Sequence, residues 1–223
     1  MDRGGGAVET TKRGAAERRC VVIGGADIGR YDRIRARLRE DDFFICCDGG
    51  LRHRGGLGIA PDLVVGDFDS HENPHLPVET IVLPCEKDDT DTVFAVRTAL
   101  DRGFQDFLLL GCTGGRLDHT LGNVSLLLML EARGKRAVLL DDFSEMEVVS
   151  AGPVQIEDRY ACFSLLSAGG AARGVTVRGV KYPLSNAEIT SEYQYGISNE
   201  VLPGERAEVS LREGRLLLVK VLP

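Results

Sequence analysis

The chain has 223 residues, with 34 acidic and 27 basic side chains and therefore a formal net charge of −7. This length suits one large domain or two small ones, and the acidic balance argues against a protein that binds nucleic acid through bulk charge. No apolar run approaches the roughly 20 residues that span a bilayer, so we expect no nucleic acid and no membrane among its partners.

The N-terminal segment is rich in Gly, Arg and Glu and holds no apolar stretch. A secretory signal needs such a stretch, so we predict a disordered tail over residues 1–18 and a cytoplasmic protein. None of the six cysteines forms a C-x-x-C pair, and the adjacent Cys46 and Cys47 sit inside an apolar run. We interpret the cysteines as small buried side chains in a reducing compartment rather than as a zinc site.

The first half alternates short apolar runs with segments of helical periodicity. The runs are apolar on both faces, as in the strands of a parallel sheet that helices cover on both sides. The spacing of Tyr31, Ile34 and Leu38 indicates an amphipathic helix. Gly103 and Gly134 follow two later helices as closing residues. In chain order we predict strand 19–23, helix 31–40, strands 43–47, 63–65 and 80–83, helix 90–102, strand 107–110, helix 119–133 and strand 137–140.

The pattern changes near residues 142–152, after which few segments have helical spacing. Strand-like runs separated by Gly, Pro and Asp predict a small antiparallel sandwich or barrel. We therefore expect an α/β domain with a mainly parallel sheet over residues 19–144 and an all-β, sandwich-like domain over 145–223. The predicted strands of the second half are 146–150, 154–156, 161–166, 174–180, 207–211 and 216–221.

Acids and glycines gather where the strands of the first half end. Open α/β sheets bind their ligands at the carboxyl ends of the strands, so this edge is the candidate site. Four segments supply the polar residues: Asp48-Gly49-Gly50, then GDFDS at 66–70, KDDTD at 87–91 and GCTGGRLDH at 111–119.

Asp67 and Asp69 are two residues apart, and in extended chain such side chains point to the same side. Two neighbouring carboxylates repel each other unless a cation lies between them, and Mg²⁺ suits such a site. The alternative is a turn in which an Asp caps the next segment.

The segment from Lys87 to Asp91 opens a predicted helix. A charged N-cap explains Asp88 or Asp89, because acids in a first turn favour the helix dipole, but it explains the density of charge less well. Lys87 suits a phosphate and Asp91 a metal ion.

The glycines before the helix at 119–133 expose backbone N–H groups, which form an anion site together with the helix dipole. Arg116 adds a planar donor fork for phosphate. His119 and Asn123 are four residues apart and share one helix face. The alternative is a plain Gly-rich turn.

These motifs, in this order, resemble the thiamine pyrophosphokinase family. The residues GISNE at 196–200 are similar to that family's thiamine-contacting Ser-Asn segment. The resemblance implies an α/β catalytic domain, a C-terminal β-sandwich, and a homodimer whose active sites are shared between subunits. It also implies the reaction of ATP with thiamine to give AMP and thiamine diphosphate, with Mg²⁺.

The resemblance further implies a role for each matched residue. The metal ligands would be Asp48, Asp67, Asp69 and Asp91, of which Asp69 or Asp91 would accept the hydroxyl proton of thiamine. Tyr195, Ser198 and Asn199 would contact thiamine. The chain departs from the family in having no Trp, which some members stack on thiamine, and Tyr193 or Tyr195 would take its place. The expected ATP-binding residues are Lys87, Asp88, Thr90, Thr113, Gly115, Arg116, Asp118, His119 and Asn123.

Two other functions are compatible with parts of the pattern. A phosphatase of the haloacid-dehalogenase type also uses Asp-x-Asp after an apolar strand, but there the motif lies on the first strand and here it lies on the third. A module that senses nucleotide or thiamine diphosphate needs fewer metal ligands than this chain carries.

Overall fold

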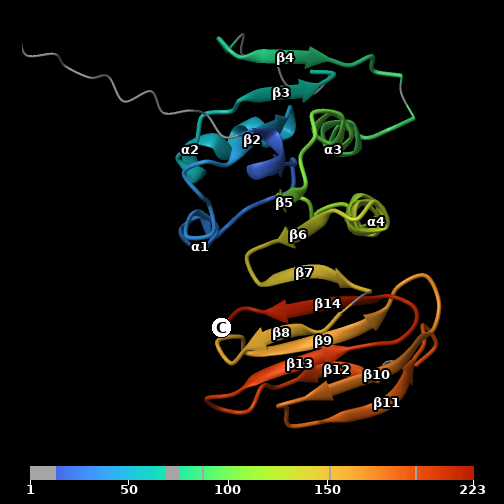
Figure 1. Ribbon diagram of the computed structural model, residues 1–223. Helices are drawn as coiled ribbons and strands as arrows, with labels where there is room; N and C mark the ends of the chain where they lie inside the picture. The colour runs from blue at the N-terminus through green and yellow to red at the C-terminus, as the bar shows by residue number, and fades with distance from the viewer. Residues whose placement is uncertain (1–13, 69–75, 87, 151, 194) are drawn as a thin grey trace, which may run out of the picture.

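The computed structural model describes residues 14–68, 76–86, 88–150, 152–193 and 195–223. Within these residues, ten strands form one sheet in the order β12-β9-β14-β7-β6-β5-β1-β2-β3-β4, and four form a second sheet in the order β11-β10-β13-β8. Figure 1 shows the α/β half with its helices at the top and the two packed sheets at the bottom. None of the described helices is long and apolar enough to cross a membrane.

Six neighbouring strands of the large sheet are parallel, as predicted. Helices α1 (Tyr31–Arg35) and α2 (Arg54–Leu57) cover one face, and α3 (Asp91–Asp101) and α4 (Leu117–Ala132) cover the other (Figure 1). Both faces of the inner strands are therefore buried, which explains why these strands are mostly apolar. The strands are β1 (Arg19–Ile23), β2 (Phe43–Cys47), β3 (Leu63–Gly66), β4 (Glu79–Val82), β5 (Asp106–Leu110) and β6 (Arg136–Leu140).

The second half is all β, as predicted, and its two sheets pack face to face. Val149 and Phe163 from the large sheet are buried against Val175 from the small one. The last strand, β14, lies between β7 and β9 and pairs with both. The strands are β7 (Ser144–Val149), β8 (Val154–Glu157), β9 (Cys162–Ser167), β10 (Ala172–Arg178), β11 (Leu184–Ile189), β12 (Gly196–Asn199), β13 (Arg206–Ser210) and β14 (Leu216–Val221).

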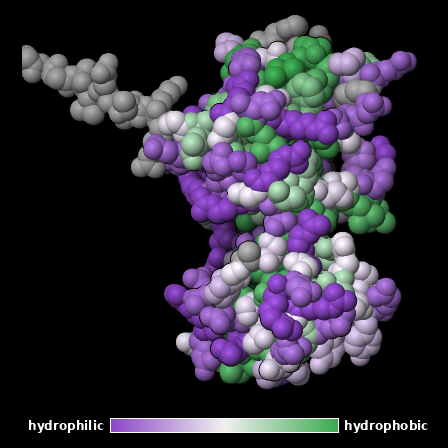
Figure 2. Space-filling model, turned by 45° about the vertical axis from the view of Figure 1, so that its right-hand side comes forward, coloured by the Kyte–Doolittle hydropathy of each residue, from purple (hydrophilic) through white to green (hydrophobic). Residues whose placement is uncertain are grey.

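The two halves share the large sheet, because β7 pairs antiparallel with β6. Buried Glu145 on β7 strengthens this junction. Its carboxylate forms ion pairs with Arg37 from the α/β half and with Lys220 of β14, and it accepts a hydrogen bond from Tyr160 at 2.9 Å. The surface narrows where the halves meet (Figure 2). The domain division at residue 144 stays a prediction, and it falls on a strand that hydrogen-bonds to both halves.

Several elements differ from the prediction. The helix predicted over 31–40 ends at Arg35, because the amides of Arg37 and Leu38 bond three residues back and so tighten the chain. Strands β11 and β12 were not predicted, since each is a largely exposed edge strand with few apolar residues.

The predicted N-terminal tail lies mostly in residues 1–13, which are outside the described part of the chain. Residues Ala15–Glu17 form a 3₁₀ turn, η1. The guanidinium of Arg18 donates to the carbonyls of Asp41 and Asp42 at 2.8 and 3.0 Å, so this end of the described chain is tied to the loop before β2.

Candidate active site

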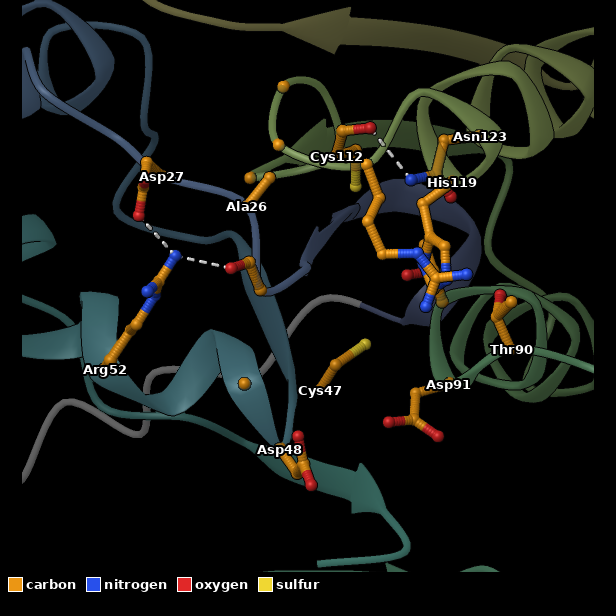
Figure 3. A pocket seen from close by; sticks show the side chains of 17 residues that line it. Ala26, Asp27, Cys47, Asp48, Arg52, Thr90, Asp91, Cys112, His119 and Asn123 are labelled. Atoms are coloured by element: carbon orange, nitrogen blue, oxygen red, sulfur yellow. Dashed lines mark hydrogen bonds and ion pairs between the residues drawn. The ribbon is translucent and has the colours of Figure 1, made fainter. Parts of the chain in front are cut away.

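The candidate site lies where the strand order reverses. Strand β1 has β2 on one side and β5 on the other, and the chain reaches β5 only after β4 and α3. Such a switch point leaves a crevice at the carboxyl ends of the strands. A cavity of about 450 Å³ opens there, and its walls come from the loops after β1, β2 and β5 and from the N-termini of α3 and α4 (Figure 3).

Two glycines of the sequence motifs allow the backbone to close around this crevice. A Cβ on Gly50 would lie 2.0 Å from the carbonyl oxygen of Ile23, and a Cβ on Gly66 would lie 2.5 Å from the Cβ of Asp48. No side chain fits at either distance. These glycines therefore bring the ends of β1, β2 and β3 together and place Asp48 directly over β3.

Three predicted metal ligands meet at the edge of the sheet. Asp48 follows β2, Asp67 follows β3 and Asp91 begins α3, and one oxygen from each carboxylate lies within 4.8 Å of the others. Figure 3 shows Asp48 and Asp91 on the same side of the cavity. An all-carboxylate donor set of this size fits a hard divalent cation such as Mg²⁺. The fourth predicted ligand, Asp69, lies outside the described residues.

The N-terminus of α3 delivers Asp91 to the site. Thr90 is the N-cap, and its side chain accepts a hydrogen bond from the amide of Val93 at 3.4 Å. The helix dipole adds positive potential at this end of α3, where the cavity lies. Asp88 is exposed and does not line the cavity, and Lys87 lies outside the described residues.

The Gly-rich loop before α4 forms the opposite wall. Gly114 and Gly115 line the cavity with φ of +90° and +64°. Arg116 is the N-cap residue of α4, and its guanidinium binds the carboxylate of Asp118 at 2.5 and 3.1 Å. This hydrogen bonding lowers the pKa of Asp118 to about 2, so the carboxylate stays ionised. Asp118 itself does not line the cavity.

Asn123 lines the cavity from α4 but uses its amide to hold the loop. It is buried, and its Nδ2 donates to the carbonyl of Cys112 at 2.8 Å (Figure 3). His119 lines the same wall. Thr113 lies outside the cavity lining and donates its hydroxyl proton to Asp141 at 3.0 Å, so it fixes the loop from behind.

Sequence reasoning missed the wall opposite α4. Arg52 lines the cavity, and its guanidinium donates to the carbonyl of Gly25 and to Asp27 at 2.7 Å (Figure 3). The available signal was the position of Arg52, four residues after Asp48 in the segment that follows β2.

The neighbouring His53 is buried and locks this wall in place. Its Nδ1 accepts the hydroxyl proton of Tyr31 at 2.7 Å, while its Nε2–H donates to the carbonyl of Ala26 at 2.9 Å. Burial lowers the pKa of His53 and favours this neutral form.

Two predicted thiamine contacts, Ser198 and Asn199, lie on β12 at the far edge of the large sheet, and the third, Tyr195, directly precedes that strand. Asn199 is buried, and its amide binds both the N–H and the carbonyl of Tyr182, at 3.1 and 2.8 Å. Tyr195 and Asn199 line a second cavity of about 440 Å³. Ser198 lies outside that lining, with φ of +56° and its N–H bonded to the hydroxyl of Ser164 at 3.1 Å.

Comparison with known proteins agrees with this arrangement. A family described as thiamin pyrophosphokinase, catalytic domain, matches residues 34–139, and one described as its vitamin B1 binding domain matches residues 154–216. A thiamine pyrophosphokinase of Bacillus subtilis is 33% identical over 209 residues, which cover 89% of this chain and 96% of that protein.

Solved structures match along nearly the whole chain. The thiamine pyrophosphokinase structure from Bacillus subtilis has a TM-score of 0.79 at 28% identity, covering 92% of this chain and 99% of its own. The structure from Geobacillus thermodenitrificans has a TM-score of 0.78 at 28% identity, with 92% and 98% covered. The Candida albicans structure, at 14% identity and a TM-score of 0.72 over 92% and 89%, shares the fold. The chain belongs to the thiamine pyrophosphokinase family.

Proposed function

We propose that this protein transfers a pyrophosphoryl group from ATP to thiamine, giving thiamine diphosphate and AMP, at the cavity beside Asp48, Asp67 and Asp91. The observation that carries the proposal is the meeting of these three carboxylates at the ends of β2 and β3 and the start of α3. Two of them, Asp48 and Asp91, line the cavity, which the N-termini of α3 and α4 also line. Carboxylates for a divalent cation next to N–H groups for phosphate suit a metal-bound polyphosphate.

The residues fit Mg²⁺ as the resident cation. Asp48, Asp67 and Asp91 would hold it, with Asp69 as the fourth predicted ligand. When bound, the ion neutralises charge on the phosphate oxygens of ATP. Family membership and the three-carboxylate cluster support this assignment.

The chain's own residues then position the nucleotide and receive the proton. Gly115 and Arg116 face the phosphates from the start of α4, together with the predicted Lys87. The hydroxyl oxygen of thiamine forms a bond to the β-phosphorus as the bond from that phosphorus to the oxygen of AMP breaks. The hydroxyl proton passes to Asp91 or Asp69. Holding the reacting groups in line is the main contribution of the protein.

We also propose that each active site draws on two subunits. In the large sheet β12 is seven strand spacings from β2, or ~34 Å at about 4.8 Å per strand. Thiamine held at β12 cannot reach the carboxylates of the same chain over that distance. The exposed side chains around β12 also favour a partner surface: Tyr182, Tyr193, Tyr195, Ile197 and Leu202.

A product assay tests the reaction. The protein is incubated with ATP, Mg²⁺ and thiamine, and the expected result is AMP and thiamine diphosphate in equal amounts. Asp48→Asn is expected to abolish both products, while Asp32→Asn, a change at an exposed carboxylate outside the cavity, is expected to leave them unchanged. Release of inorganic phosphate in place of AMP would indicate the phosphatase, and no turnover would indicate a sensing module. Either outcome contradicts the proposal.

A further inference from the structure

Arg52 is placed to act on the nucleotide, although no motif identifies it. Among the described residues that line the active-site cavity, only Arg52 and Arg116 carry a fixed positive charge. They belong to opposite walls, one from the segment after β2 and the other from the start of α4. Arg116 forms an exposed ion pair with Asp118, just as Arg52 forms one with Asp27.

The guanidinium of Arg52 donates to the carbonyl of Gly25 and forms an ion pair with Asp27, and this ion pair is weak. The side chain of Asp27 is 95% exposed and that of Arg52 is 46% exposed. Exposed ion pairs of this kind contribute little, because water and salt compete with them. A phosphate group offers a guanidinium more charge and a matching bidentate geometry. A nucleotide in the cavity can therefore take over the guanidinium from Asp27.

The backbone under Arg52 is rigid. Arg52 lies in the 3₁₀ segment η2 (Gly49–His53), which begins directly after Asp48. The buried ring of His53 ties this segment to Tyr31 and to the loop after β1. Asp48 and Arg52 are thus fixed at the two ends of one short helix, about 8 Å apart along its axis. That spacing suits a single polyphosphate chain. One of its phosphates would contact a cation bound at Asp48, and another would contact the guanidinium of Arg52.

We propose that Arg52 binds a phosphate group of the nucleotide, and that Asp27 serves only as its counter-ion while the cavity is empty. The inference rests on the proposed function, since it assumes that the cavity takes ATP. The competing interpretation is that Arg52 and Asp27 form a structural strap that holds the loop after β1.

Calorimetric binding of α,β-methylene ATP, an analogue that cannot transfer its pyrophosphoryl group, separates the two interpretations. We expect Arg52→Ala to weaken binding by about tenfold or more, because it removes a charge-assisted contact. Asp27→Ala breaks the same ion pair but keeps the cation, so we expect it to bind the analogue as tightly as wild type or more tightly. Arg52→Gln keeps an N–H donor for the carbonyl of Gly25 and serves if Arg52→Ala does not fold; it should weaken binding to a similar extent.

Equal weakening by Arg52→Ala and Asp27→Ala would identify a strap and overturn the proposal. So would a loss of less than about threefold in both Arg52 variants. The measurement is independent of turnover: a protein that binds the analogue through Arg52 but yields no AMP with thiamine would contradict the proposed function and leave the role of Arg52 intact.

Discussion

At the scale of single residues, the carboxylate cluster lowers the stability of the fold at the place where the proposed function needs a metal ion. Asp48, Asp67 and Asp91 bring their charges within 4.8 Å of one another, and like charges at that separation repel. The fold tolerates this arrangement at the point where a divalent cation would relieve it. Residues selected only for stability would not leave three acids there.

Asp67→Asn tests whether this carboxylate both serves the metal site and destabilises the protein without the metal. We expect turnover to fall at least about 100-fold at saturating Mg²⁺, the size of loss that follows removal of one charge-stabilising group. Without Mg²⁺ the melting temperature should rise slightly, because one repulsive charge is gone. Added Mg²⁺ should then stabilise the variant less than it stabilises wild type. Near wild-type turnover, or an undiminished stabilisation by Mg²⁺, would remove Asp67 from the metal site.

Asn199 could be selected as a candidate from the sequence, but the residues that its side chain contacts could not be predicted. The Ser-Asn motif identified it, and its contact with thiamine stays a prediction. The structure adds that its amide holds both backbone groups of Tyr182, a residue 17 positions earlier in the chain. A motif of five letters carries no information about that partner, because the pairing depends on how two loops meet.

At the scale of elements, η2 and the loop after β1 depend on a neutral histidine. Burial lowers the pKa of His53 below its usual value of 6.5. As the pH falls below 6.5, the unfolded chain takes up a proton at this residue while the folded one resists it. The proton therefore favours the unfolded state, and stability falls as the pH drops through this range.

His53→Gln should reduce that acid sensitivity, since an amide can accept from Tyr31 and donate to Ala26 without titrating. We expect the drop in melting temperature between pH 7.5 and 5.5 to be smaller in this variant than in wild type. His119→Gln changes an exposed histidine and is the matched control, with a drop like that of wild type. Equal drops in all three proteins would mean that His53 does not govern the acid response.

The elements that could be predicted from sequence are those whose pattern reflects burial on both sides. Strands β1, β2, β3 and β5 are buried, and the acids and glycines at their ends predicted the edge of the sheet at which the candidate site lies. Edge strands β11 and β12 have one polar, exposed face and little periodicity, so they were missed. Arg52 was missed for a related reason. Its position four residues after Asp48 was visible in the sequence, but its place in the cavity wall depends on how the segment after β2 packs against the loop after β1.

At the scale of the whole molecule, the distance between the carboxylates and β12 implies that two subunits share each active site, and this can be tested. Asp67→Asn damages the α/β half, and Asn199→Ala damages the β12 segment. If sites are shared across a dimer, a mixed dimer has one site with both faults and one site with neither. We expect activity to return when the two inactive proteins exchange subunits, to at most about half of wild type per mixed dimer.

Subunit exchange must be verified independently, for example with two differently tagged chains, and each variant must be inactive alone. Under those conditions, no recovery of activity would show that each chain completes its own site. The chain would then have to bring thiamine to the carboxylates by a route that does not involve β12.

The position of β14 has a consequence for the synthesis of the protein. The last strand of the chain lies between β7 and β9, and its Leu216 and Leu218 are fully buried in the core of the sandwich. On the ribosome, the α/β half can fold while the rest of the nascent chain is still being made. The sandwich cannot close, because the strand that joins β7 to β9 emerges last. Until β14 has emerged, a newly made chain therefore carries a folded α/β half and an open β half, and a truncation that removes Leu216–Val221 leaves that half open.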